Sequence, residues 1–273
     1  DRLSRDASET FYEGRASDAD LLHITHSFRL FRETAKERVA CLQRLYQRQE
    51  GDIFCIPGGL YREGSIEAAY RQIEANDATL LALLDDETKR YNELKELLTE
   101  HPVYERVFAD VNGCGPRIAA AIISVIGDIR RFRTRAQLRA YFGVHVKPDG
   151  SFPRRKRGER ANWHTEGRLA LYLLSQQWQR RPESDWGAKL IENKARYREK
   201  HPEEVTVTRK NRDGSDRKVT NYTKAHINRM AHWKTVTQFL SHHVFPRWWE
   251  LEEETTGVLR TGTRDRIEGK YVR

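Results

Sequence analysis

Apolar residues recur at helical spacing over most of the chain, and this pattern predicts a mostly α protein. One apolar face between Phe28 and Leu45 predicts a first amphipathic helix. A step of about 3.5 residues from Ile66 to Leu98 meets mainly apolar positions, which is the spacing of a coiled coil. We therefore predict a long antiparallel helical hairpin with a coiled-coil seam over residues 27–103.

A glycine-rich turn opens the next section of the chain. Asn112-Gly113-Cys114-Gly115-Pro116 stands directly before an apolar run of small residues. We expect Gly113 and Gly115 to adopt positive φ, and Pro116 suits the first turn of a helix. Such a turn predicts a helix-hairpin-helix whose backbone N–H groups, including those of residues 117–119, point outward beside Arg117 and bind a DNA phosphate. The alternative is a plain turn between two packed helices.

A strongly basic, irregular section follows at residues 147–168. It contains seven Lys or Arg against three Asp or Glu, with Phe152 and Trp163 interleaved. Basic and aromatic side chains together are typical of surfaces that follow a nucleic-acid backbone. The candidate DNA-binding side chains here are Arg154, Arg155, Lys156, Arg157, Arg160 and Arg168.

Ser151 lies inside this basic section, after Pro148-Asp149-Gly150. Nearby cations stabilise negative charge that develops on an attacked phosphate, and they favour loss of a hydroxyl proton. Ser151 is therefore a candidate nucleophile. Closing a turn is the alternative role for this serine.

The rest of the chain adds a small hairpin and one further helix. Alternating residues with Asp213-Gly214 between them predict a β hairpin near residues 205–220. A last helix is predicted over about Lys224–His243, ending before the Phe-Pro pair, and residues 251–273 are predicted to be a flexible tail. The histidines lack the spacing of a zinc site and are predicted to lie on the surface or to face DNA; they are His164, His226, His232, His242 and His243.

The charge balance narrows the class of partner. The net charge is +9, which favours a polyanion such as nucleic acid. The three cysteines form no metal-type pattern, and their odd number argues against a disulfide framework, so a reducing, cytoplasmic setting is expected. No apolar stretch reaches the roughly 18 residues of a membrane span. The chain begins with Asp1, and its one methionine is Met230, so we expect a fragment of a longer protein.

The order of these pieces resembles a known family. The segment from Val111 to Val144, a serine-bearing basic loop and the later Gly-Arg-Leu-Ala-Leu-Tyr-Leu-Leu-Ser stretch together resemble the C-terminal part of DEDD-type insertion-sequence transposases. That family has a RuvC-like N-terminal domain, a serine-bearing transposase domain and a guide called bridge RNA. The resemblance implies a truncated RuvC-like end at 1–26, the helical hairpin at 27–103, a transposase domain at 104–250 and the tail at 251–273.

The resemblance also implies an activity and its partners. It implies a transposase or recombinase in which Ser151 attacks a DNA phosphodiester and holds a covalent DNA intermediate. It implies DNA, a bridge RNA and a homo-oligomer, a dimer or tetramer, in the bacterial cytoplasm near the nucleoid. The other interpretation is a non-catalytic helix-hairpin-helix protein that binds nucleic acid.

The family's N-terminal domain binds a divalent metal, expected to be Mg²⁺, through carboxylates. On this chain the resemblance points to Asp18 and, as a substitute partner, Asp20. The remaining carboxylates would lie upstream of Asp1. A solvated acidic helix start explains the same residues equally well.

Overall fold

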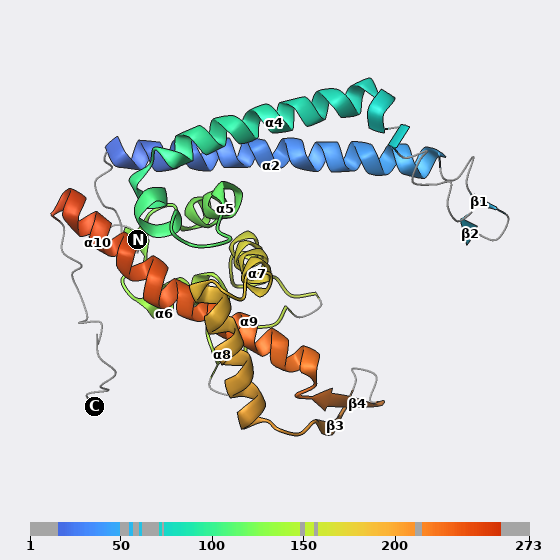
Figure 1. Cartoon of the computed structure of the whole chain (residues 1–273), viewed down its shortest axis with the longest axis vertical. Coiled ribbons are helices and arrows are strands. Elements are labelled where there is room, and N and C mark those ends of the chain that lie inside the picture. The colour runs from blue at the N-terminus through green and yellow to red at the C-terminus, as the bar shows by residue number, and fades with distance from the viewer. Residues whose placement is uncertain are drawn as a thin grey trace, which may run out of the picture. The chain divides into compact units, whose positions relative to one another are not determined.

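The computed structural model describes residues 16–49, 55–56, 60–61, 71–72, 74–147, 151–155, 158–210 and 215–257. Most of these residues are helical, and two small antiparallel pairs of strands accompany them, which confirms the mostly α prediction (Figure 1). The chain divides into two compact units, Asp1–Thr99 and Glu100–Arg273. No described helix is both long and apolar enough to cross a bilayer.

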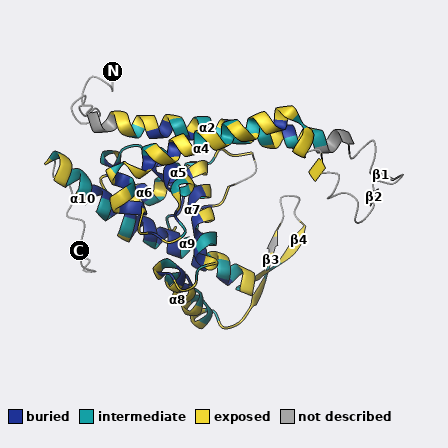
Figure 2. Cartoon of the chain, turned by 45° about the horizontal axis from the view of Figure 1, so that its top comes forward, coloured by how far each residue is buried: buried dark blue, intermediate teal, exposed yellow. Residues whose placement is uncertain are grey.

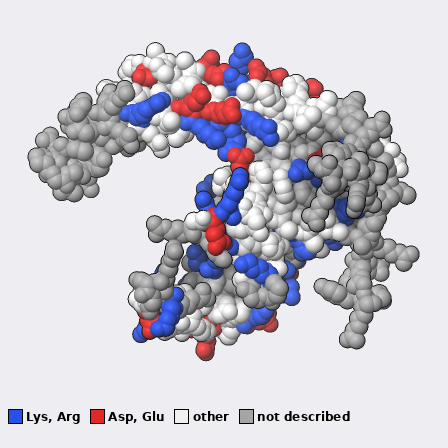
Figure 3. All heavy atoms as spheres, turned by 180° about the vertical axis from the view of Figure 1, so that it is seen from behind, with Lys and Arg blue, Asp and Glu red and all other residues white. Residues whose placement is uncertain are grey.

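The first unit is an antiparallel helical hairpin of α2 (Ala16–Gln49) and α4 (Ala78–Thr99). Phe31 contacts Tyr91 with ring centroids 5.6 Å apart, while Arg38 forms an ion pair with Glu87. A later residue of α2 therefore contacts an earlier residue of α4, so the two helices are antiparallel, as the sequence predicts. Charged side chains of both signs adjoin along this hairpin, so much of its charge is compensated locally (Figure 3).

The predicted apolar seam of α4 is only partly used. Leu80, Leu94 and Leu98 are buried, but Leu84 is 48% exposed. Asp77, a position of the predicted seam, lies before the helix, and its Oδ1 accepts a hydrogen bond from the Leu80 amide at 2.7 Å. Its carboxylate therefore starts α4 instead of packing in the seam.

The connection and the start of this unit differ in detail from the sequence pattern. Two short strands, β1 (Cys55–Ile56) and β2 (Leu60–Tyr61), pair within the segment predicted to be a loop. Residues 62–70, where the second helix is predicted to begin, lie outside the described ranges. The first helix begins at Ala16 and runs without a break across the predicted boundary at residue 27.

Most of the buried apolar residues belong to the second unit, whose helices carry most of the buried positions in Figure 2. Trp178 is at its centre: its ring stacks on Trp186 at 5.5 Å and meets the edge of Phe239 at 5.2 Å. Trp248 and Phe108 extend this aromatic core. The α-helices around it are α5 (Pro116–Ile126), α6 (Arg135–Tyr141), α7 (Thr165–Gln179), α8 (Asp185–Lys200), α9 (Lys224–Phe239) and α10 (Phe245–Thr256).

The predicted end of the last helix is wrong. After α9 comes one π-helical turn, η4 (Leu240–Val244), and α10 then continues the helix to Thr256. Pro246 directly follows η4, and the wider i→i−5 turn accommodates its ring and its missing N–H without ending the helix. Burial of Phe245, Trp248 and Trp249, at helical spacing, holds α10 on the core.

The predicted β hairpin is confirmed. Strands β3 (Val205–Lys210) and β4 (Asp216–Asn221) pair antiparallel, with Val207 opposite Val219. The predicted turn at Asp213-Gly214 lies outside the described residues. Directly after β4, Thr223 caps α9 by accepting a hydrogen bond from the His226 amide at 3.2 Å. The hairpin therefore leads straight into the helix that forms one side of the site described next.

Candidate nucleic-acid site around Ser151

The two ends of the Ser151 loop are held together beside α6. The His164 amide donates to the Tyr141 carbonyl at 2.8 Å. Gly143 has a φ of +66°, and a Cβ there would lie 2.4 Å from Cγ of Trp163. Only glycine therefore lets the chain leave α6 and pack directly under the indole. Within the loop, the Lys147 amide donates to the Ser151 carbonyl at 2.9 Å, which fixes the backbone on which the serine stands.

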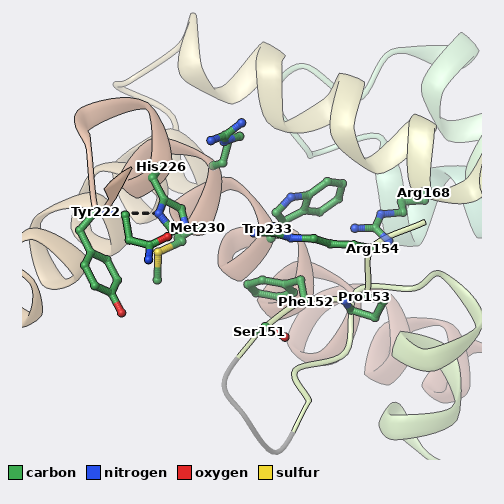
Figure 4. A pocket seen from close by; sticks show the side chains of 11 residues that line it. Ser151, Phe152, Pro153, Arg154, Arg168, Tyr222, His226, Met230 and Trp233 are labelled. Atoms are coloured by element: carbon green, nitrogen blue, oxygen red, sulfur yellow. Dashed lines mark hydrogen bonds between the residues drawn. The ribbon is translucent and has the colours of Figure 1, made fainter. Parts of the chain in front are cut away.

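Ser151 opens onto a pocket of about 450 Å³. Phe152 of the loop and Trp233 of α9 lie on the side nearest to Ser151, and Met230 of α9 with Tyr222, which follows β4, lies on the other (Figure 4). Arg168, from the first turn of α7, also lines the pocket. Ser151 itself is half-buried at the edge of the pocket. The side chains used in the argument below are Phe152, Arg154, Tyr222, Arg229, Met230 and Trp233.

Arg168 lies between two indole rings. Its Cζ is 4.9 Å from the ring centroid of Trp163 and 4.5 Å from that of Trp233. Such stacking orients the planar guanidinium and stabilises its charge. Burial lowers the pKa of Arg168 from its ordinary value, because the charged form is poorly hydrated there. Its Nη1 is buried and has no hydrogen-bond partner among the described residues. An anion with free oxygens would satisfy both the charge and this N–H.

The structure divides the arginines that the sequence grouped around Ser151. Arg154 and Arg168 line the Ser151 pocket, and Arg229 of α9 joins them. Arg155 and Arg160 instead line a second pocket of about 300 Å³. Arg154 borders both pockets and so connects them. Lys156 and Arg157 lie outside the described residues.

The second pocket is also electropositive. His145 and Lys147 line it together with Arg155 and Arg160. Burial, and then the charges of Lys147, Arg139 and Arg168, lowers the pKa of His145. Two adjoining basic pockets on either side of Arg154 are suited to successive phosphates of one strand.

The far wall of the Ser151 pocket is formed by residues that the sequence analysis did not assign. Tyr222 stacks on His201 with ring centroids 3.8 Å apart and on His226 at 5.6 Å, and both ring pairs are nearly parallel. Its backbone has a φ of +60°, which is costly for a tyrosine. The Tyr222 amide donates to Nδ1 of His226 at 2.9 Å, and the Tyr222 carbonyl accepts from Arg198 at 3.3 Å. These contacts hold the wall in a fixed conformation.

A sequence signal for this wall exists. His226, Arg229, Met230 and Trp233 recur at intervals of three and four residues, so they share one face of α9. That face carries cationic and aromatic side chains and is not an apolar core face. Its relation to Ser151 cannot be read from the chain, because more than 70 residues separate Ser151 from the nearest of them.

The glycine turn differs from the prediction at Gly115. Gly113 has a φ of +83°, as expected, but Gly115 has φ −68° and ψ 171°. The residue before a proline is restricted to this extended region, and Pro116 therefore determines the conformation of Gly115. The amides of Ile118 and Ala119 both donate to the Gly115 carbonyl at 3.0 Å. They do not point outward as an anion nest.

The turn packs against α7. Nε1 of Trp178 donates to the Asn112 carbonyl at 3.1 Å, and a Cβ at Gly113 would lie 2.7 Å from Cβ of Gln177. These contacts favour the plain structural turn. Arg117 is exposed. DNA binding by Gly113, Gly115 and Arg117 stays a prediction.

Alanine at the two glycines should have unequal effects on stability. Gly113→Ala forces a side chain into left-handed backbone and against Gln177, and should lower the free energy of unfolding by about 2–4 kcal/mol. Gly115→Ala meets nothing within 4 Å and should cost less than about 1 kcal/mol. Urea denaturation of both variants measures the difference. Equal losses would contradict this account of the turn.

Two of the histidines predicted to lie on the surface are in the interior. His232 is 3% exposed, with Nδ1 2.9 Å from Oγ of Ser175 and Nε2 2.7 Å from Oε1 of Gln179. Burial, and then the charge of Lys194, lowers the pKa of His232 to about 4, so it is neutral at pH 7. His243 is largely buried, with Nε2 2.7 Å from the Val107 carbonyl. The prediction is wrong for both because each ring is buried and finds a hydrogen-bond partner within the fold.

The described residues leave Asp18 and Asp20 untested as metal ligands. Asp18 and Asp20 lie in the first turns of α2, and Asp20 is exposed. In the described part of the chain, no group of three or more His, Cys, Asp or Glu side chains could hold a metal ion. Binding of Mg²⁺ through Asp18 and Asp20 stays a prediction.

Part of this site lies in a segment that matches a known protein family. Residues 105–190 match the model of the family described as Transposase IS116/IS110/IS902 family. No curated protein matches the chain at a significant level. The matched segment is less than half of the chain; it includes Ser151 and Arg168 but not the α9 wall. Residues 105–190 are therefore similar to a transposase domain of the IS116/IS110/IS902 family.

Proposed function

We propose that this chain acts in DNA transposition and that Ser151 is the nucleophile that cuts and rejoins DNA. One observation carries the proposal: Ser151 shares a pocket with Arg154 and Arg168, inside the segment that matches a transposase family. A hydroxyl that shares a pocket with two guanidinium groups is suited to chemistry on a phosphodiester.

The proposed step is a transesterification. Oγ of Ser151 gives its proton to water and attacks the phosphorus, so a serine O–P bond forms and one strand P–O bond breaks. The departing strand oxygen takes up a proton and becomes a hydroxyl. The intermediate is again a phosphodiester, now between Ser151 and one DNA end. Attack on it by the hydroxyl of another strand therefore reverses the step and rejoins the DNA.

The arginines have separate roles in this step. The guanidinium of Arg168, held between Trp163 and Trp233, is oriented before DNA arrives and stabilises charge on the phosphate oxygens without reorganisation. Arg154 is exposed, and its positive charge attracts the incoming strand and neutralises one of its phosphates. Positive charge around Ser151 also favours the ionised hydroxyl.

The remaining parts of the proposal concern partners. A guide RNA and Mg²⁺ belong to it, with the metal held by carboxylates that the described residues do not complete. Exchange between two DNA ends needs more than one Ser151 site, which favours a homo-oligomer. Leu81 and Leu84 of α4 are 44% and 48% exposed and offer apolar surface for such an assembly. We therefore propose a cytoplasmic location at the nucleoid, where the DNA substrate lies.

Salt dependence tests whether DNA is the partner. If the two basic pockets together neutralise about six phosphates, the log–log slope of affinity against salt should be about −5. Replacing both Arg154 and Arg168 by alanine should make the slope less steep by about 2. Electrophoretic mobility shifts at several salt concentrations measure both slopes. A slope near zero would contradict nucleic acid as the partner.

A further inference from the structure

We propose that the pocket beside Ser151 receives one unpaired base of the DNA strand, so that the strand is cut where the duplex is opened. The inference rests on the proposed function, because it takes Ser151 as the position of the phosphate that is attacked. It adds the substrate class: a strand with at least one nucleotide out of the stack.

The dimensions of the pocket support one nucleotide and not a duplex. Its volume of about 450 Å³ lies near the lower end of the range for small-ligand sites, roughly 300–1,000 Å³. A paired base has both faces covered by its neighbours and its edge covered by its partner. It can enter a pocket of this size only after it leaves the helix.

Phe152 and Trp233 form the wall nearest to Ser151. Their ring centroids are 6.5 Å apart, and the rings are tilted by 41°. Phe152 directly follows the serine in the chain, and Figure 4 shows its ring next to Ser151. Both residues are half-buried, so each keeps surface for a ligand. Stacking of a base on an aromatic side chain contributes about 1–3 kcal/mol without selecting a sequence.

Met230 and the Tyr222 stack form the opposite wall (Figure 4). The positive φ of Tyr222 is maintained by its contacts with His201, His226 and Arg198. A strained residue that its surroundings hold in place is typical of a site formed before the ligand binds. A flexible thioether opposite fixed aromatic rings adapts to either a purine or a pyrimidine.

Polar groups at the pocket suit the remaining parts of a nucleotide. Asn221 and Arg229 line it on the α9 side, and Arg154 and Arg168 on the Ser151 side. The amide of Asn221 both donates and accepts hydrogen bonds, as the edge of an unpaired base requires. The inference places the phosphate at Arg168 and the base between the two walls, in the same pocket that Ser151 lines.

The test uses the 273-residue chain carrying Ser151→Ala, so that binding is measured without chemistry. Its affinity is compared for a DNA duplex with one bulged nucleotide and for the same duplex fully paired. The bulged nucleotide is 2-aminopurine, whose fluorescence falls when it stacks on an aromatic ring. We expect at least tenfold tighter binding of the bulged duplex, together with quenched fluorescence.

Pocket variants show whether this preference arises in the pocket. Phe152→Ala and Met230→Ala should each reduce the preference to less than threefold and leave affinity for the paired duplex within twofold. Leu173→Ala removes a similar apolar side chain from an exposed position of α7 outside the pocket and should change neither value. Urea denaturation of every variant establishes that it is folded.

Three results would overturn the inference. The first is equal affinity for the two duplexes, and the second is a preference that survives in both pocket variants. The third is saturation of the pocket by a free deoxynucleoside monophosphate at micromolar concentration, which would indicate a soluble nucleotide as the ligand. None of these depends on the nucleophile. Strand exchange that persists in Ser151→Ala would instead refute the proposed chemistry and leave the bulge preference standing.

Discussion

Replacing Ser151 by alanine should reduce DNA strand exchange by at least a thousandfold and change DNA affinity by less than twofold. A nucleophile forms its bond only in the transition state, so its loss lowers the rate and hardly affects ground-state binding. The experiment supplies wild type and variant with the guide RNA and Mg²⁺ of the proposal. Exchange is followed by the appearance of joined product, and affinity by mobility shift.

Stability provides the control for this variant. Ser151 is half-buried in a loop, and the hydrogen bond that fixes the loop uses its carbonyl, which alanine keeps. The free energy of unfolding should therefore change by no more than about 0.5 kcal/mol. A folded Ser151→Ala protein that still recombines DNA would refute Ser151 as the nucleophile. Thr165, the other hydroxyl of the basic section, begins α7 and does not line the Ser151 pocket.

Removing Arg168 should lower both DNA affinity and the rate of exchange. Arg168→Ala should raise the Kd for DNA about 10- to 100-fold, because a charge-assisted hydrogen bond of a buried guanidinium contributes about 1.5–3 kcal/mol. The rate should fall further, since charge on the phosphate oxygens increases in the transition state. Arg168→Lys should recover less than half of the lost binding energy, because an ammonium cannot stack as a plane between Trp163 and Trp233.

Arg155 offers a matched comparison. It is exposed and lines the second pocket, so Arg155→Ala should raise the Kd less than tenfold and leave the rate in the bound complex nearly unchanged. Titrations and single-turnover rates at saturating DNA separate the two effects. If Arg155→Ala slowed exchange as much as Arg168→Ala, or if Arg168→Lys behaved as wild type, the special role of the stacked guanidinium would be contradicted.

Much of the fold could be predicted from local patterns. Helical periodicity predicts the α2–α4 hairpin, and the alternation around Asp213-Gly214 predicts the β3–β4 pair. The errors occur where a neighbouring residue or the tertiary fold determines the local structure. Pro116 sets the backbone of Gly115, and the π-helical turn η4 lets the helix continue past Pro246, where the sequence predicts its end.

Only one part of the candidate site, the basic section around Ser151, could be predicted from the sequence. The density of arginines around Ser151 indicates a phosphate surface, but the pattern does not distinguish Arg154 and Arg168 from Arg155 and Arg160. Folding separates them: Pro153 and Arg154 border both pockets, Arg168 lines only the first, and Arg155 and Arg160 line only the second. The α9 wall was missed because only the tertiary structure brings it to Ser151.

The covalent bond between Ser151 and DNA is the most direct test of the proposed chemistry. The chain is incubated with end-labelled DNA, Mg²⁺ and the guide RNA, denatured, and separated by electrophoresis; the adduct is then digested and its peptide identified by mass spectrometry. The account predicts a labelled band that resists denaturant, a phosphoester on Ser151, and no such band with Ser151→Ala. Strand exchange without any adduct, or an adduct on a different residue, would contradict it.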